Sequence, residues 1–327
     1  MRRLVFTVFL LAAVAAGWGL WWIHHPMRLA TPTVDLSIDA GTLPRAVAQA
    51  VADSGVDVDP RLLYAWFRVS GRSRAIKAGS YELEAGITPY ELLRKLARGE
   101  ETLRAVTLVE GWTFRQFRAA LGKEENLKPD TKDLSDDAIM TLLGRPGVPA
   151  EGRFFPDTYT YGKDTSDVAV FRRALRAMDK RLAAAWALRS PQAAVKTPDE
   201  ALILASIIEK ETGHPADRPL VSAVFSNRLR AGMPLQTDPT VIYGLGTAFD
   251  GMLHKKDLLA DTPWNTYTRA GLPPTPISMP GRGSLLAAVQ PAASQALYFV
   301  ARRDGTSQFS NSLDEHRRAV NKYQRGP

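Results

Sequence analysis

The chain contains no cysteine, although it is 327 residues long. Disulfide bonds, thiolate metal sites and a cysteine nucleophile are therefore excluded. This absence is compatible with an oxidising compartment such as the periplasm. Histidine is also rare: there are five, and none belongs to the His-Glu-x-x-His pattern of zinc hydrolases. The sequence therefore predicts neither a metal site nor another cofactor.

Internal repeats and low-complexity segments are absent as well, and so is a stripe of basic residues. The formal net charge is +8, but Lys and Arg are scattered along the chain with Asp and Glu between them. A nucleic-acid-binding surface would gather its positive charge on one face or one helix. We therefore expect no nucleic-acid partner, and only weak attraction to anionic surfaces such as lipid headgroups.

One long segment, from Leu4 to Ile23, carries no charge at all. A helix of about 20 residues rises about 30 Å, which matches the hydrocarbon core of a bilayer. Indole rings prefer the membrane interface, and three tryptophans lie at the far end of the segment: Trp18, Trp21 and Trp22. The segment predicts a transmembrane helix over residues 4–24.

The basic residues around this helix predict its orientation. Arg2 and Arg3 precede it, and only Arg28 follows closely. By the positive-inside rule, residues 1–3 form a cytoplasmic tail and the rest of the chain lies beyond the membrane. A cleaved signal peptide is the alternative, because residues 12–17 are small. The bulky tryptophans that follow leave no clear cleavage site, which favours a retained single-pass anchor.

The part after the anchor mixes strand-like and helical patterns, so we predict an α+β fold. Residues 25–33 suggest a short stalk. Residues 34–102 suggest a small α+β unit, in which residues 34–38 alternate apolar and polar as a half-buried strand does. Residues 103–327 form a second, larger α+β unit. Within the small unit, helices are expected at residues 43–54, 59–70 and 88–98, and a second strand at residues 76–83.

The most clearly marked helix of the chain follows residue 196. Thr197 can cap it, Pro198 suits its first turn, and Glu200 completes a capping box. The helix is expected to run to Thr212, and Gly213 is placed to end it.

Two glutamates lie near the end of this helix, and its geometry separates them. At about 100° per residue, Glu211 falls on the bulky apolar side of Leu204 and Ile207, whereas Glu209 falls beside the smaller Ala205. Desolvation and the negative end of the helix dipole should raise the pKa of Glu211. A carboxylic acid that stays protonated near neutral pH suits general acid catalysis of glycosidic cleavage. A glutamate in a last helical turn is also typical of a solvated surface, so the spacing alone leaves both readings open.

The loops after this helix have a composition that suits sugar binding. Residues 263–268 and 271–277 combine aromatic, amide, hydroxyl and proline side chains. Such side chains stack on sugar rings and bond to their hydroxyls, although a well-ordered surface loop has the same composition. Asp238, directly before Pro239, is typical of a helix cap and is equally a candidate for the site.

Several of these segments together resemble the YceG-like family of endolytic murein transglycosylases. The matching motifs occur in a fixed order over nearly the whole chain, which makes the resemblance specific. One departure is Trp264, where relatives have a tyrosine; it keeps an aromatic face. The motifs are residues 77–81, 109–111, 155–158, 205–212, 224–229, 235–244, 265–268, 271–274 and 297–300, together with His316.

The resemblance implies a lytic transglycosylase, a carbon–oxygen lyase. It would cleave the bond between N-acetylmuramic acid and N-acetylglucosamine within glycan strands, leave a 1,6-anhydro end, and terminate or trim nascent strands during cell-wall synthesis. It also implies that residues 34–102 are similar to a LysM-like peptidoglycan-binding module and that residues 103–327 form the catalytic domain. With the anchor, it predicts an inner-membrane protein whose bulk is periplasmic. Peptidoglycan strands are the expected partner, and peptidoglycan synthases are candidate partners.

The family's catalytic glutamate matches Glu211. Protonated Glu211 would give its proton to the leaving oxygen, and its carboxylate would then accept the proton of the muramic acid 6-hydroxyl, which closes onto the anomeric carbon. No water attacks, so the second carboxylate of hydrolytic glycosidases is not required. This agrees with the single persuasive buried acid that the sequence offers. The candidates for substrate positioning are Gln236, Thr237, Asp238, Asn265 and Tyr267.

Two alternatives remain open at this point. A hydrolytic muramidase of the lysozyme type would need a second carboxylate, for which Asp238 is the best candidate. A non-catalytic envelope scaffold would only hold peptidoglycan. A Glu211→Gln protein separates enzyme from scaffold, and the chemistry of the product ends separates the two enzymes.

Overall fold

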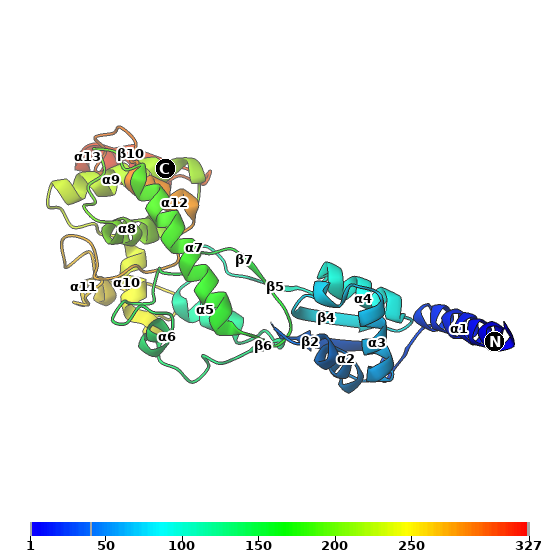
Figure 1. Cartoon of the computed structure of the whole chain (residues 1–327). Helices are drawn as coiled ribbons and strands as arrows, with labels where there is room; N and C mark the ends of the chain where they lie inside the picture. Colours follow the sequence, from blue (N-terminus) through cyan, green and yellow to red (C-terminus); the bar gives the residue numbers. More distant parts are fainter. Residues whose placement is uncertain (1, 40, 326–327) are drawn as a thin grey trace. The chain divides into compact units, whose positions relative to one another are not determined.

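The computed structural model describes residues 2–39 and 41–325 (Figure 1). Of the expected cytoplasmic tail, Met1 lies outside the described residues and Arg2 already begins the first helix. The chain is 48% helical and 11% strand, which confirms the α+β class. It divides into two compact units. Unit 1 comprises Met1–Ala105, Asn126–Lys128 and Thr160–Thr165, and unit 2 comprises Val106–Glu125, Pro129–Tyr159 and Ser166–Pro327.

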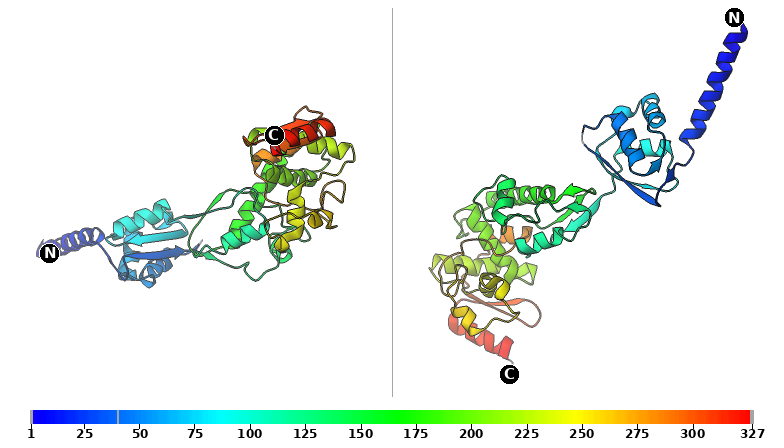
Figure 2. Two further views of the ribbon diagram at one scale, coloured as in Figure 1. Left: turned by 180° about the vertical axis from the view of Figure 1, so that it is seen from behind. Right: turned by 90° about the horizontal axis from the view of Figure 1, so that it is seen from below.

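Unit 1 begins with the apolar helix α1 (Arg2–Ile23). Its segment Val5–Ile23 is long and apolar enough to cross a membrane, and only 6% of this apolar stretch is buried in the protein. Both views of Figure 2 show α1 as a single helix that leaves the rest of unit 1 at its C-terminal end. An exposed helix of this length and composition fits a single-pass membrane protein.

The body of unit 1 has the order strand, helix, helix, strand. Strand β2 (Thr33–Ile38) pairs antiparallel with β4 (Gly79–Glu84), and α2 (Pro44–Asp53) and α3 (Pro60–Val69) lie between them in sequence. The alternating pattern of β2 buries Val34, Leu36 and Ile38 against the helices. Helix α4 (Pro89–Arg98) follows, opened by the predicted Thr88 capping box and closed by Gly99 at φ 69°.

The expected stalk at residues 25–33 is instead a built part of unit 1. Met27 is buried, and its N–H donates to the carbonyl of Ile87 at 2.9 Å. Strand β1 (Arg28–Leu29) pairs with β3 (Val56–Asp57). The reason is that Met27 and Leu29 supply apolar surface to the core of unit 1, which composition alone did not indicate.

Short strand pairs accompany the crossings of the chain between the two units. Strand β5 (Arg104–Thr107) pairs with β7 (Thr158–Tyr161), and β6 (Leu127–Lys128) pairs with β8 (Thr165–Ser166). Unit 1 thereby includes two segments that come after its main part in sequence. A single linear boundary near residue 102 does not describe this arrangement.

Unit 2 is mainly helical and is built around α8 (Pro198–Glu211). Helices α7 (Asp167–Ala187), α9 (Arg218–Arg230), α10 (Asp238–Leu245) and α12 (Arg282–Val289) all contact it. A hairpin of β9 (Tyr298–Ala301) and β10 (Ser307–Ser310) is antiparallel. The other helices of unit 2 are α5 (Phe114–Leu121), α6 (Asp136–Leu142), α11 (Lys255–Leu259) and α13 (Leu313–Val320), with short helical turns η2 (Pro215–Asp217), η3 (Gly246–Ala248) and η4 (Asn321–Arg325). The turn η1 (Ser73–Ala75) belongs to unit 1.

Candidate active site

The start of α8 is close to the predicted one. Thr197 is the N-cap, and its hydroxyl accepts the Glu200 N–H at 3.1 Å. The Glu200 carboxylate does not return to Thr197 but accepts the N–H of Lys196 at 2.6 Å. The N–H that bonds to the Glu200 side chain therefore belongs to Lys196, one residue before the N-cap residue expected for a capping box. Glu211 is the last residue of the helix, and Thr212 rather than Gly213 caps its end.

Helix α8 is buried on all sides, not on one. Residues 201–208 are all buried except Ile203, which is partly buried, because α7, α9, α10 and α12 surround the helix. The side that carries Glu209 therefore lies in the core as much as the side that carries Glu211. The bulk of the neighbouring side chains, on which the sequence argument relied, therefore does not separate the two glutamates, and they must be separated by their partners.

The carboxyl of Glu211 is held by the loop that precedes α10. The Thr237 hydroxyl donates a hydrogen bond to its Oε1. Burial raises the pKa of Glu211, the negative charge of Asp238 raises it further, and the Thr237 hydrogen bond opposes both. Among residues 2–39 and 41–325, no basic side chain forms an ion pair with Glu211. A carboxyl in these surroundings is favoured in its protonated form.

The backbone of this loop holds Thr237 where its hydroxyl meets the Glu211 carboxyl. Gln236 has φ 51°, a left-handed conformation that non-glycine residues adopt rarely and at a cost of about 1 kcal/mol or more. Its N–H donates to the carbonyl of Thr266 at 3.0 Å, and the Thr237 N–H donates to Thr266 Oγ1 at 3.1 Å. The Thr240 hydroxyl donates to the Thr237 carbonyl at 2.7 Å. The strain is therefore held by three bonds to buried threonines.

Asp238 is not the cap of α10 but its first residue. Thr237 occupies the N-cap position, without a side-chain bond to the helix. The exposed Asp238 carboxylate accepts the hydroxyl of Tyr267 at 2.6 Å instead. Burial and this bond to Asp238 raise the pKa of the Tyr267 phenol, which therefore stays a hydrogen-bond donor. The cap interpretation was wrong by one residue, and the carboxylate belongs to the surroundings of Glu211.

Asn265 braces the loop that carries Tyr267. It is fully buried, and its amide donates to the carbonyls of Leu258 at 3.1 Å and Ala260 at 2.7 Å. Its side-chain oxygen accepts the N–H of Tyr267 at 2.8 Å. Both polar groups of its side-chain amide are thus hydrogen-bonded within the protein. Asn265 therefore affects the site by holding the backbone of Tyr267 in place.

Glu209 has entirely different partners. Its side chain is 6% exposed and forms an ion pair with Arg218 at 3.2 Å, while Oε2 accepts the Gly281 N–H at 2.9 Å. Glu110 lies beside the same group, and its pKa is raised by burial and by the charge of Glu209. Gly281 leaves room for Glu110, because a Cβ at this position would lie 1.9 Å from the Glu110 carboxylate. This cluster joins residues 109–111 and 280–283 to the end of α8.

A further buried acid, Glu151, was missed from the sequence. It is 9% exposed, its two carboxylate oxygens accept the Phe114 N–H at 3.1 and 3.2 Å, and Oε2 accepts the Tyr243 hydroxyl at 3.2 Å. Burial raises the pKa of Glu151 to about 7. Its partners are 37 and 92 residues away in sequence, and its own segment has no helical or strand periodicity. The expectation of a single buried acid was therefore wrong.

Arg228 forms hydrogen bonds with the strained loop that contains Gln236. Its guanidinium is buried and donates to the carbonyl of Leu235 at 3.0 Å and to the side-chain oxygen of Gln236 at 3.3 Å. It also lies over the ring of Tyr298, at 5.1 Å from the centroid, and His316 stacks on that ring at 5.2 Å. Burial and the charge of Arg228 lower the pKa of His316, which favours a neutral imidazole there.

Among the described residues no cluster of three or more His, Asp or Glu could hold a metal ion.

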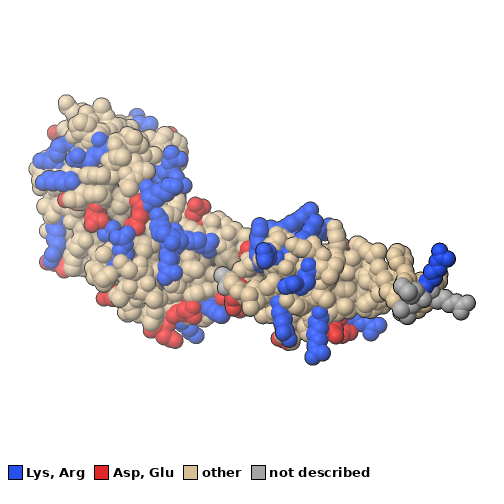
Figure 3. Space-filling view, in the orientation of Figure 1, with Lys and Arg blue, Asp and Glu red and all other residues tan. Residues whose placement is uncertain are grey.

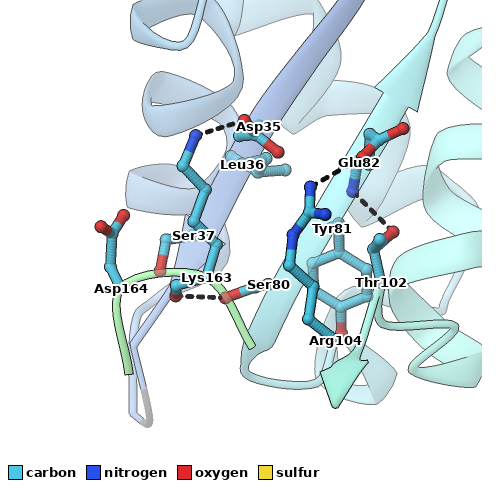
Figure 4. Close-up of a pocket in the computed structure, with 10 residues that line it drawn as sticks. All are labelled: Asp35, Leu36, Ser37, Ser80, Tyr81, Glu82, Thr102, Arg104, Lys163 and Asp164. Carbon is cyan, nitrogen blue, oxygen red and sulfur yellow. Dashed lines mark hydrogen bonds and ion pairs between the residues drawn. The ribbon is translucent and has the colours of Figure 1, made fainter. Parts of the chain in front are cut away.

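A small polar cavity of about 100 Å³ lies in unit 1, on the β2–β4 pair (Figure 4). Lys163 points toward Asp35 and forms an ion pair with it. The Ser80 hydroxyl donates to the Lys163 carbonyl at 2.9 Å, and the Thr102 hydroxyl accepts the Glu82 N–H at 3.1 Å. These bonds tie the segment 160–165 to the strand pair, which accounts for the polar groups without a ligand.

The fold and the site define an α+β protein with an apolar N-terminal helix and a protonatable glutamate at the end of a buried helix. The sequence profile of the YceG-like family matches residues 36–322, and the chain belongs to this family.

Known relatives cover most of the chain. The endolytic murein transglycosylase of Bacillus subtilis (strain 168) is 31% identical in an alignment of 308 residues, which covers 89% of this chain and 85% of the relative. The protein of that name in Streptococcus pneumoniae serotype 2 is 27% identical over 88% of this chain, which spans only 58% of that relative. A crystal structure of a YceG-like protein from Listeria monocytogenes matches with a TM-score of 0.57 at 30% identity, over 88% of this chain and 99% of that one.

Proposed function

We propose that the chain is an endolytic lytic transglycosylase of peptidoglycan, with Glu211 as its acid and base. The observation that carries the proposal is the setting of Glu211, a largely desolvated carboxyl held by a neutral hydroxyl and without a cationic partner among the described residues. General acid catalysis of glycosidic cleavage requires a carboxylic acid that is protonated near neutral pH. The shared name of the relatives supports the substrate and the position of cleavage within the strand.

The reaction needs one carboxyl. The Thr237 hydroxyl donates to Oε1, so we assign the acid proton to Oε2. This proton goes to the glycosidic oxygen of N-acetylglucosamine as the bond from that oxygen to C1 of N-acetylmuramic acid breaks. The Glu211 carboxylate then accepts the proton of the C6 hydroxyl, whose oxygen bonds to C1. The acid is restored, no water is consumed, and a 1,6-anhydro end remains.

The five candidate positioning residues divide by exposure. Gln236 and Asp238 are exposed and Tyr267 is partly exposed, so these three can contact a glycan directly. Thr237 and Asn265 are buried, so they act through Glu211 and Tyr267 respectively. In this division, Tyr267 and Asp238 form one polar unit because the phenol donates to the carboxylate.

The decisive experiment is mass spectrometry of the products from purified full-length protein and uncross-linked glycan strands. We expect internal cuts with 1,6-anhydro-muramic ends and no reducing ends. Reducing ends that incorporate ¹⁸O from labelled water would establish a hydrolytic muramidase instead, with Asp238 as the first candidate for the base. If the folded protein binds glycan strands but does not cleave them, the protein is a non-catalytic scaffold.

The location of the enzyme is part of the same proposal. We place the anchor in the inner membrane with the short end in the cytoplasm, because Arg2 and Arg3 precede the span. Residues 34–102 are proposed as a LysM-like glycan-binding module, in keeping with the strand–helix–helix–strand order of β2, α2, α3 and β4. An enzyme so placed can trim or terminate nascent strands beside the peptidoglycan synthases. A phosphatase reporter fused after the last residue should be active only in the periplasm, and activity of a cytoplasm-dependent reporter there would reverse the orientation.

A further inference from the structure

Helix α3 has two apolar faces, and the core of unit 1 uses only one of them. Leu63 and Phe67 are fully buried. Leu62, Ala65 and Val69 recur at helical spacing on a second face, which we call the outer stripe. Ala65 is exposed, and Val69 exposes 84% of its surface. Large apolar side chains on a second helix face need a partner that is not the core of their own unit.

The outer stripe faces the C-terminal end of α1. Together with the segment of α1 from Ala16 to Ile23, the stripe and Trp66 line an open apolar cavity of about 290 Å³. Trp66 is fixed in this wall because its indole N–H donates to the carbonyl of Pro89 at 3.2 Å. The cavity is therefore a wedge between the end of a helix that can span a membrane and one face of α3.

The end of α1 is anchored to unit 1, so the wedge is a built feature. Ile23 is 7% exposed, and Trp22 packs against the core of unit 1. The rings of His24 and Tyr90 lie 5.2 Å apart, and the Met27 N–H bonds to the Ile87 carbonyl at 2.9 Å. Because these contacts attach the end of α1 to unit 1, the depth of α1 in a bilayer sets the depth of α3.

Helix geometry gives this depth. The 19 residues of Val5–Ile23 rise about 28 Å, close to the hydrocarbon thickness of about 30 Å. The part of α1 that faces α3 begins at Ala16 and covers the last ~10 Å of the span. The outer stripe of α3 thus lies level with the boundary between acyl chains and headgroups.

The charge of α3 and of the turn that follows suits that boundary. Residues 60–81 contain no acidic residue. The face of unit 1 that is in view in Figure 3 carries several Lys and Arg side chains, with a few Asp and Glu among them. Long basic side chains at an interface bind anionic headgroups while their stems lie on apolar surface. The basic residues of this stretch are Arg61, Arg68, Arg72, Arg74 and Lys77.

We propose that α3 is an interfacial helix: its outer stripe is inserted in the leaflet at the C-terminal end of α1, acyl chains fill the wedge, and Arg68, Arg72 and Arg74 bind anionic headgroups. The occupant is lipid because the stripe continues the apolar surface of α1 and is followed in sequence by Arg68, Arg72 and Arg74, for which the described part of the chain provides no ion pair. Unit 1 is then a membrane-surface module, whatever glycan it also binds.

The absence of cysteine makes a direct test possible. Val69→Cys is labelled with an environment-sensitive nitrobenzoxadiazole dye in the full-length protein, reconstituted in vesicles of phosphatidylethanolamine and phosphatidylglycerol. The matched control is Ala46→Cys, an exposed position on α2 that does not line the wedge. We expect blue-shifted emission from the Val69 label and strong quenching by lipids with nitroxide on the acyl chain, and neither effect at position 46.

A label at position 69 that reports water, like the control, would overturn the proposal. A blue-shifted label that nitroxide lipids do not quench would overturn it too, because the stripe would then be covered by protein. The headgroup contact is tested separately with Arg72→Glu and Arg74→Glu in the labelled protein. Quenching at position 69 should fall in anionic vesicles and stay unchanged in pure phosphatidylcholine, and equal quenching in anionic vesicles with and without the two substitutions would refute the headgroup contact.

Discussion

The two sides of α8 at its C-terminal end present two buried carboxyls in opposite surroundings. On one side Glu209 meets a guanidinium and a main-chain N–H, from Arg218 and Gly281. On the other side Glu211 meets the hydroxyl of Thr237 and the negative charge of Asp238. The two residues are two positions apart in sequence and similar in burial, so burial alone does not decide which of them is the acid.

On the proposed mechanism, charge compensation is what separates Glu209, a structural carboxylate, from Glu211, the proposed acid. A buried carboxylate beside a guanidinium has its charge compensated and is bound to a fixed partner. A desolvated carboxyl beside a second carboxylate is more stable when protonated, and it can lose its proton to a leaving group. The predictions below probe this contrast, beginning with the largest expected effect.

Glu211→Gln should lower the rate of anhydro-product formation by about 10²–10⁴-fold, because an amide keeps the shape but cannot donate the acid proton. Glu209→Gln is the matched control, two residues away on the same helix, and it should retain most activity in the folded protein. Both purified variants are compared by melting curves and by mass spectrometry of the products. An inactive Glu209 variant beside an active Glu211 variant would reverse the assignment.

Arg218→Met should destabilise unit 2 by about 3 kcal/mol, because it leaves the Glu209 carboxylate buried without its cation. The double variant Arg218→Met with Glu209→Gln should recover much of this loss, since position 209 then carries no buried charge. Urea unfolding of the wild type, the two single variants and the double variant measures the coupling. Additive effects of the two substitutions would show that the ion pair does not matter to stability.

Glu151 extends the comparison to a third buried acid, whose hydrogen-bond partners, Phe114 and Tyr243, differ from the Thr237 partner of Glu211. Burial raises the folded-state pKa of Glu151 to about 7, above its ordinary value of 4.5, so between these pH values the folded protein holds a proton that the unfolded chain has lost. Stability should therefore fall as pH rises from about 4.5 to 7, by about 3 kcal/mol. Glu151→Gln should abolish this slope and retain activity, as denaturant unfolding at several pH values will show. An unchanged slope would mean that another group titrates.

Local patterns predicted unit 1 well and the site only in part. The strand at residues 34–38, the helix at 59–70 and the Thr88 capping box all rest on neighbouring residues, and the structure has β2, α3 and the box there. The position of Glu211 at a helix end was equally readable. Its partners were not, because Thr237 is 26 residues away. Nor did periodicity reveal that α8 is surrounded by four helices, which is why the argument from one apolar face failed.

Thr237→Val tests the only hydroxyl that the described structure places on Glu211. The Thr237 hydrogen bond lowers the pKa of Glu211, so its loss should raise that pKa further. The basic limb of the rate profile, where the acid loses its proton, should move to higher pH, and the maximal rate should fall by about tenfold as the carboxyl loses its orientation. Thr237→Ser is the control that keeps the hydroxyl and should restore both. A basic limb that does not move in the valine variant would mean that Thr237 does not bond to Glu211 in the active enzyme.

Asp238→Asn should have the smallest effect, and one of opposite sign. The negative charge of Asp238 raises the pKa of Glu211, so removing it should lower that pKa and move the basic limb to lower pH. Asparagine keeps an oxygen that can accept the Tyr267 hydroxyl, now 2.6 Å from the carboxylate, so the loop should stay in place. The rate below the limb should change only a few-fold if Asp238 acts by charge alone. A loss as large as that of Glu211→Gln, together with reducing ends in the residual product, would instead identify Asp238 as the base of a hydrolytic reaction.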